Sequence, residues 1–440
     1  MELKYGSDLV GRLQKFMASA DPLVLVVLAL LALGGVVLAG MRKRNLLVGF
    51  YVLAACFSGF MVPAIDAGST LFRWMVLLLL AATALRGMAS PGWPAILLAL
   101  YGVLAFVLAF LGPVAWYSAQ LSLLFVVLNG LVGAAVADGL RTSEGVKSLT
   151  RRFVWGATAF AIIALVSLPR LREGFRFAGA SGAEAPLFVM TGGFLMPFAL
   201  YNAMGGPTRR YRIYCGALTA VTAMLLILSG QRTGTVAGLI ACVPLLFRLR
   251  VKYLLLGAGV AILTVGAIWV AFNLAPAQGR FVTERFTSTD LTGREFLWRQ
   301  TIAACWRSPW IGGGMGSTRP AYLGVHNAYL AAWYDTGFFG LALFAGAYLA
   351  MAASTLRLVL KRKDREGADL GRLLFGLSLG LIASGMVEES MYSPSNLMAF
   401  TAVAVSAMAS ALRAQTAEGV RKAVPRPAMF EPLPQPLVGK

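Results

Sequence analysis

Long uninterrupted runs of apolar residues dominate the chain, and they predict membrane-spanning helices. The hydrocarbon core of a bilayer is about 30 Å thick, so a helix needs about 20 apolar residues to cross it, and about thirteen stretches meet this requirement. Continuous apolar runs favour helices, because strands of a membrane barrel would alternate between apolar and polar positions. The centres of the predicted spans lie near Val26, Val52, Leu77, Ala105, Val126, Ala161, Met196, Thr222, Gly238, Ala261, Phe344, Gly380 and Ala404.

Composition agrees with this pattern. Hydrophobic residues make up 58% of the 440 residues and charged residues only 13%, and the mean hydropathy is +0.73. A water-soluble domain of this size does not show this balance. The sequence therefore predicts an all-α, polytopic membrane helical bundle of about 12 to 13 spans.

Positive charges alternate from one connection to the next, which predicts the orientation. The positive-inside rule places Lys- and Arg-rich connections in the cytoplasm. Arg12 and Lys15 favour a cytoplasmic N-terminus, whereas thirteen crossings would put it outside; twelve spans would remove the conflict. The basic connections are 42–44, 141–152, 209–212, 248–252 and 357–372.

Three outer segments are more than bare turns: 170–185, the short turn 231–234, and 275–325. Connections longer than about 12 to 15 residues usually have a function. Within the longest, Arg294, Trp298, Ile302 and Cys305 recur at helical spacing, which predicts a helix lying at the membrane surface. Pro309 and a run of glycines are expected to end it in a tight turn.

These features divide the chain into five segments. We expect an amphipathic N-terminal lead-in without a preceding signal peptide, a transmembrane bundle of about ten spans, a large periplasmic loop, a second group of transmembrane helices, and a basic, Pro-containing cytoplasmic tail. The segments are 1–21, 22–274, 275–325, 326–414 and 415–440.

The cations of the outer segments are all arginine. Arginine presents a planar fork of donors that matches phosphate oxygens, which lysine lacks. However, arginine outnumbers lysine about three to one along the whole chain, so chance comes close to producing this pattern. Arg232 lies between two spans near the outer membrane boundary, where it either binds a ligand or anchors the helix by extending to water.

His326 is the only histidine, and it begins the span that follows the large loop. A helix N-terminus disfavours a charged imidazole, so we expect a lowered pKa and a neutral ring able to act as a base near pH 7. The neighbouring Tyr329 and Trp333 fit an interfacial anchor equally well. Glu388 and Glu389, at the outer end of the next span, are open to the same two interpretations.

Several kinds of site lack the residues they need. A single histidine, four scattered cysteines and the absence of an Asp-x-Asp motif predict neither a metal site nor a disulfide framework. The sequence contains no nucleotide-binding glycine loop, and we expect no cofactor. The net charge of +20 is largely explained by the cytoplasmic connections, so we expect no nucleic-acid partner.

Four short motifs occur in order in the C-terminal half: Ser-Gly-Gln-Arg-Thr-Gly at 229–234, Gly-Arg-Glu-Phe-Leu-Trp at 293–298, Ser-Pro-Trp-Ile-Gly-Gly-Gly-Met-Gly at 308–316, and His-Asn-Ala-Tyr-Leu at 326–330. Together with the membrane topology, they resemble the O-antigen ligase superfamily. The sequence departs from that pattern at Gln231, where serine is frequent, and at Asp335, where glutamate is usual.

The resemblance implies an inverting, metal-independent glycosyltransferase of the bacterial inner membrane whose active site faces the periplasm. The donor would be O-antigen glycan on undecaprenyl pyrophosphate, and the acceptor would be a sugar hydroxyl of lipid A-core. Membrane lipids would surround the protein. His326 would be the base. Arg232 and Arg294 would bind the pyrophosphate, with Arg176 and Arg299 as further candidates. Possible supporting residues are Asn327, Tyr329, Glu388 and Glu389.

Two kinds of alternative stay open. An O-antigen polymerase or a protein oligosaccharyltransferase of the same superfamily would differ only in its acceptor. A flippase or transporter for lipid-linked oligosaccharides would instead need charged groups within the membrane, and Asp335 is the acidic residue that fits such a function.

Overall fold

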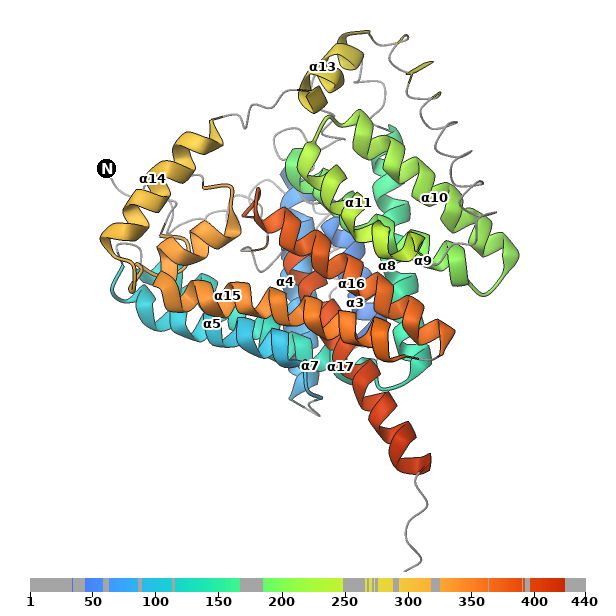
Figure 1. The fold of residues 1–440 in the computed structure, drawn as a ribbon, viewed down its shortest axis with the longest axis horizontal. Coiled ribbons are helices and arrows are strands. Elements are labelled where there is room, and N and C mark those ends of the chain that lie inside the picture. Colours follow the sequence, from blue (N-terminus) through green and yellow to red (C-terminus); the bar gives the residue numbers. More distant parts are fainter. Residues whose placement is uncertain are drawn as a thin grey trace, which may run out of the picture.

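The computed structural model describes residues 44–57, 63–85, 89–112, 115–166, 185–247, 276–287, 293–317, 325–362, 364–389 and 396–423, with a few single positions between them. Every regular element in these ranges is a helix, which confirms the all-α class. Six of these helices are long and apolar enough to cross a membrane, and four shorter helices are also apolar. The chain is therefore a polytopic helical membrane protein (Figure 1).

The helices follow one another along the chain with short connections in most places. They are α3 (Arg44–Ala55), α4 (Pro63–Ala84), α5 (Trp93–Ala109), α6 (Ala115–Val127), the π-helix η1 (Leu128–Val132), α7 (Gly133–Gly139), α8 (Ser143–Val166), α9 (Ala185–Gly205), α10 (Arg209–Leu228), α11 (Arg232–Leu246), α13 (Pro276–Thr287), α14 (Arg294–Arg307), α15 (Ala328–Lys361), α16 (Arg365–Gly385) and α17 (Leu397–Ala423).

The predicted span centres agree with this order. Every centre from Val52 to Gly238, and from Phe344 to Ala404, falls inside a helix. The centres near Val26 and Ala261 lie outside the described residues, as do the lead-in 1–21 and most of the tail. The exact number of spans and the five-segment division stay predictions.

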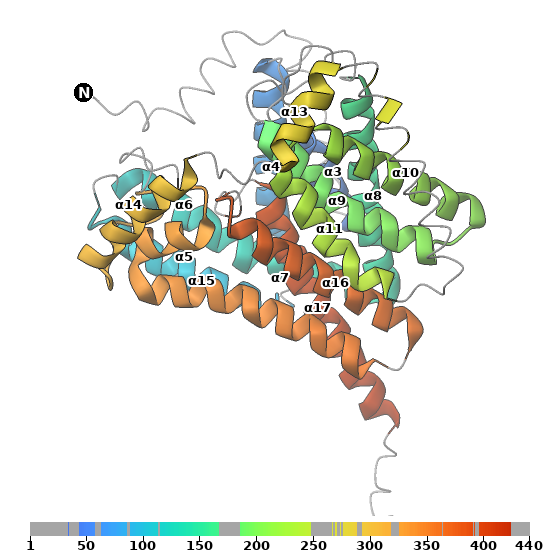
Figure 2. The ribbon, with the colours of Figure 1, turned by 45° about the horizontal axis from the view of Figure 1, so that its top comes forward.

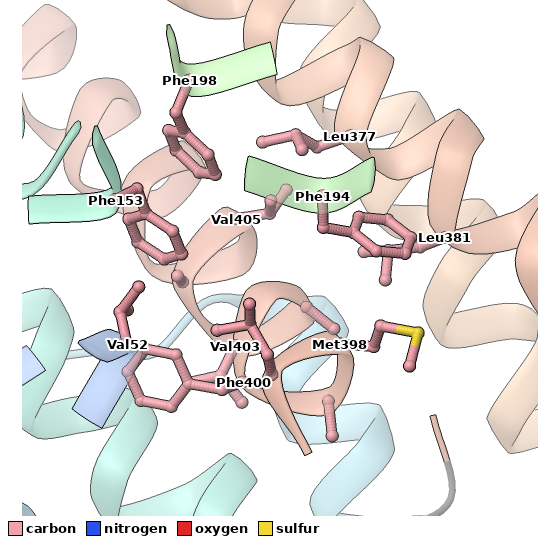
Figure 3. Packing of buried hydrophobic residues seen from close by; sticks show 14 of the residues in the cluster. Val52, Phe153, Phe194, Phe198, Leu377, Leu381, Met398, Phe400, Val403 and Val405 are labelled. Carbon is pink, nitrogen blue, oxygen red and sulfur yellow. The ribbon is translucent and has the colours of Figure 1, made fainter. Parts of the chain in front are cut away.

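Much of the core forms around the first part of α17, which lies inside the bundle, whereas the end of this helix extends beyond the other helices (Figures 1 and 3). Phe400 of α17 packs against Tyr51 of α3 with 4.3 Å between ring centroids. Nearby, Phe153 of α8 stacks on Phe198 of α9 at 4.0 Å. These side chains are almost fully buried, and large aromatic contacts of this kind stabilise helix packing beyond simple area burial.

Glycines let α11 approach both α9 and α16 closely. A Cβ added to Gly380 of α16 would lie 2.8 Å from the backbone oxygen of Ala237, and one on Gly376 would lie 2.0 Å from that of Ala241. Such spacing of small residues is typical of membrane helix pairs. Because higher numbers in α16 meet lower numbers in α11, the two helices run antiparallel, and the end of α16 lies at the same end of the bundle as Arg232.

Helix α15 bends at Gly337, whose φ of 71° and ψ of −172° interrupt the helix. The turn that follows α14 packs into this bend, and the backbone N–H of Phe338 donates to the carbonyl of Pro309 over 2.8 Å. A side chain at Gly337 would collide with the backbone of Trp310, since its Cβ would be 2.1 Å from the carbonyl oxygen. The turn thereby holds α14 beside the first part of α15 (Figure 2).

Candidate functional site

The chain just after α16 is held by the first residue of α14. The Arg294 guanidinium donates to the backbone carbonyl of Val387 over 2.5 Å and to Glu388 Oε1 over 3.0 Å. Side-chain exposures of 21% for Arg294 and 8% for Glu388 leave this ion pair largely shielded from water. Two segments separated by 94 residues are therefore joined by one charge-assisted contact.

His326 lies on the other side of the same carboxylate. Its Nδ1 is 3.7 Å from Glu388 Oε2, which is longer than a hydrogen bond. This nitrogen is buried, whereas the side chain as a whole is 44% exposed, so the exposure comes from the other atoms of the side chain. The Glu388 carboxylate thus lies between a guanidinium and an imidazole.

The backbone of His326 has a φ of 44°, and no other non-glycine residue in the described ranges has a positive φ. Left-handed conformations cost a residue with a Cβ free energy and persist when surrounding contacts enforce them. Two such contacts are clear. Trp298 Nε1 donates to the carbonyl of Val325 over 2.8 Å, and Asn327 Nδ2 donates to the carbonyl of Met386 over 2.9 Å.

Asn327 also caps the N-terminus of α15. Its Oδ1 accepts from the backbone N–H groups of Tyr329 and Leu330, each over 3.0 Å, an arrangement that stabilises a helix N-terminus. The expected helix start is therefore correct, and it fixes the backbone immediately after His326.

The direction expected for the His326 pKa is wrong. Glu388, facing the ring nitrogen, raises the pKa of His326 above its usual value near 6.5. Partial burial of the ring and the charge of Arg294 oppose this effect without cancelling it, and Glu389 adds to it. The helix N-terminus was the only influence visible in the sequence, but a carboxylate brought in from the next helix outweighs it.

The face of α14 also differs in part from the expected one. Arg294, Trp298 and Cys305 do face the protein, but Thr301 is buried where Ile302 was expected, and Ile302 is 37% exposed. Trp306, by contrast, keeps 67% of its surface exposed. The helix therefore has a narrow protein-facing side and a broad exposed side that includes aromatic residues.

Asp335 has a structural environment. Its fully buried carboxylate accepts from the backbone N–H of Gly316 over 2.5 Å and from the Ser317 hydroxyl over 2.7 Å. Its carbonyl accepts from the N–H of Gly314 over 2.8 Å. These hydrogen bonds hold the glycine-rich turn against α15. They explain why a buried acid is present at position 335 without the transport function considered from the sequence.

Arg232 is the first residue of α11, where Gln231 caps the helix by accepting from the N–H of Gly234 over 3.3 Å. The antiparallel register described above brings it to the end of the bundle that holds Glu388. Its side chain is half-buried.

The remaining candidates are more scattered. Arg299 is exposed on α14 and makes no hydrogen bond or ion pair with the described residues. Tyr329 points into the bundle, where its hydroxyl donates to the carbonyl of Ile382 over 3.4 Å. Glu389 acts on His326 through its charge. Arg176 lies outside the described residues.

Chemically, the site offers a half-exposed imidazole beside a buried carboxylate and a guanidinium. Such a trio can accept a proton and stabilise the imidazolium that forms. Within the described residues, no group of three or more His, Cys, Asp or Glu side chains is arranged to hold a metal ion. All four cysteines are buried free thiols.

Fold and site together define a polytopic, all-α membrane protein with a cluster of an imidazole, a carboxylate and a guanidinium at one end of its bundle. Residues 217–345 match the family described as O-antigen ligase, which confirms the resemblance to that superfamily. The matched segment includes Arg232, Arg294 and His326, whereas Glu388 lies beyond it. Enzymes of this ligase or polymerase type use lipid-linked glycans and lipid substrates. No curated protein matches the chain.

Proposed function

We propose that this protein is an O-antigen ligase, an inverting and metal-independent glycosyltransferase. It transfers glycan from undecaprenyl pyrophosphate to a sugar hydroxyl of lipid A-core at the periplasmic face of the bacterial inner membrane. The observation that carries the proposal is the cluster of His326, Glu388 and Arg294 at one end of the bundle, two of whose members belong to the matched segment.

In the proposed reaction the acceptor oxygen attacks C1 of the donor sugar. The bond from C1 to the pyrophosphate oxygen breaks, the leaving group departs with its electron pair, and the acceptor proton passes to His326. Attack from the side opposite the leaving group inverts the configuration at C1. Burial of Nδ1 against Glu388 leaves the opposite nitrogen, Nε2, as the group that would meet the acceptor.

Glu388 is proposed to position this base. A carboxylate next to one imidazole nitrogen fixes the tautomer and stabilises the charged ring after proton transfer. Arg294 holds the carboxylate in turn, at 3.0 Å, and is already engaged by Val387 and Glu388. Its effect on the donor pyrophosphate is therefore expected to combine with a positioning effect exerted through Glu388.

Arg232 is the stronger candidate for direct contact with the pyrophosphate. It begins a helix, where the backbone dipole adds positive potential, and its guanidinium can bind two phosphate oxygens at once. The negative charge that develops on the leaving group would be stabilised by such preorganised donors. Arg176 and Arg299 are proposed only as supplementary cations for the same group.

The test is a reconstituted reaction with purified protein, undecaprenyl-pyrophosphate glycan and lipid A-core, run with and without excess EDTA. We expect glycan transfer in both conditions, and product of inverted anomeric configuration. Loss of transfer with EDTA that magnesium or manganese restores would refute the metal-independent mechanism. Elongation of a second polyprenyl-linked glycan, with lipid A-core left untouched, would identify a polymerase instead.

A further inference from the structure

A second site lies at the opposite end of the bundle from His326. A cleft of about 430 Å³ opens there between α8, the turn from α9 to α10, and the start of α16. Arg365 begins α16 and Glu388 follows its end, so the two sites are about 30 Å apart at 1.5 Å per residue. The cleft is thus independent of the proposed transfer reaction.

Most charges along this cleft neutralise one another. Lys147 Nζ lies 2.8 Å from Glu366 Oε1, and Arg372 Nη1 lies 2.9 Å from Asp369 Oδ1. Arg151 pairs with Glu144. Arg365 is different, because it lines the cleft, is exposed, and makes no hydrogen bond or ion pair with the described residues. One positive charge in the cleft is therefore left without compensation.

The wall formed by Gly205, Gly206 and Pro207 leads directly into α10. The first turn of α10 carries Arg209, Arg210 and Arg212 and no acidic residue, so more positive charge lies just beyond this wall. All three arginines are exposed, and a Cβ added to Gly206 would lie 3.2 Å from Arg212 Cγ, which places Arg212 beside the cleft.

Cations at a helix N-terminus are electrostatically unfavourable, because the backbone dipole already makes that end positive. The first turns of α8 and α16 carry Glu144 and Glu366, which offset their dipoles, whereas the first turn of α10 has no acidic residue. The positive end of α10, together with its exposed arginines and Arg365, creates a potential that an anion would relieve. The carboxylates that line the cleft, those of Glu144, Glu366 and Asp369, are each paired with a neighbouring cation. The remaining arginines favour a group with several negative oxygens that several arginine forks can share.

We propose that the cleft binds a phosphate group, supplied by the headgroup of an anionic phospholipid. Immediately beyond the arginines, α10 exposes Ile213 and Tyr214 at 62% and 43%. An apolar surface starting one turn from the phosphate-binding residues is what the acyl chains of a lipid require. A soluble phosphate monoester would use the same arginines without this surface.

The experiment is a lipid titration of the purified full chain in detergent, followed by native mass spectrometry. Phosphatidylglycerol is compared with phosphatidylcholine, whose choline cancels the phosphate charge. We expect one tightly retained phosphatidylglycerol and weaker binding of phosphatidylcholine. Arg365→Gln and Arg212→Gln should each weaken phosphatidylglycerol binding about fivefold, the effect of removing one arginine near a membrane surface.

Lys361→Gln is the matched control, since Lys361 is exposed at the same end of the bundle but does not line the cleft. It should bind like the unchanged protein. Equal binding by the unchanged protein and both arginine variants, or an equal loss in Lys361→Gln, would refute the proposal in favour of diffuse surface charge. Adding glycerol phosphate distinguishes the source: failure to compete supports a lipid, and competition supports a soluble phosphate ligand in the same site.

Discussion

Replacing Arg294 by Gln tests whether Arg294 acts on His326 through Glu388. The change removes the guanidinium that donates to Val387 and Glu388 and leaves a carboxylate that is only 8% exposed without its ion-pair partner. Breaking a buried pair by removing one partner costs about 3 to 5 kcal/mol. Arg294 keeps about a fifth of its exposure, so we expect a loss near the lower limit, about 3 kcal/mol in the free energy of unfolding.

A double-mutant cycle with Glu388→Gln separates two functions of Arg294. If Arg294 acts on His326 through Glu388, each single variant should lose about 10²-fold in kcat/KM, and the double variant should lose little more than either. If Arg294 binds the pyrophosphate independently, the losses should multiply, and the donor KM should rise in the Arg294 variant alone. Arg307→Gln is the control, because Arg307 is exposed on the same helix and makes no ion pair within the described ranges.

The pH dependence of the transfer rate is a second measurement, and it should shift in opposite directions in the two variants. A base must be neutral, so the rate should rise as the pH passes through the pKa of His326. Glu388 raises that pKa and Arg294 lowers it. The rising limb should therefore move to lower pH in Glu388→Gln and to higher pH in Arg294→Gln. The proposed coupling between Arg294, Glu388 and His326 would be refuted by two results together. The losses in kcat/KM would multiply in the double variant, and the rising limb of the pH–rate profile would stay at the same pH in both single variants.

Three further predictions concern single residues. His326→Gln should fold and bind the donor yet transfer glycan about 10²- to 10⁴-fold more slowly, because glutamine cannot accept the proton; a rate near that of the unchanged protein would exclude His326 as the base. Arg232→Lys should lose most activity at an unchanged protein level, because lysine lacks the bidentate fork; donor binding equal to that of the unchanged protein would return Arg232 to a helix anchor. Gly337→Ala should lower the melting temperature, since the added Cβ meets the carbonyl of Trp310, whereas Gly346→Ala, with open space around it, should melt at or above the original temperature.

The sequence by itself determined the class of structure, for a direct physical reason. Spans must satisfy their backbone hydrogen bonds internally, so each long apolar run predicts its own helix without reference to its neighbours. The described spans were therefore located correctly, and α15 begins within two residues of His326, where the sequence predicted a helix start. The motifs around Arg232, Arg294 and His326 were likewise sufficient for the superfamily.

Only the tertiary structure decided what surrounds those residues. Glu388 was one of two acids at the end of a span, and nothing in its local sequence said that it would lie between Arg294 and His326. Asp335 seemed a candidate for transport until its partners Gly316 and Ser317 were known. Local patterns determine helices, whereas charge interactions depend on distances between residues far apart in the chain. The His326 pKa was misjudged for this reason: the helix dipole is encoded locally, but the carboxylate that outweighs it arrives from another helix.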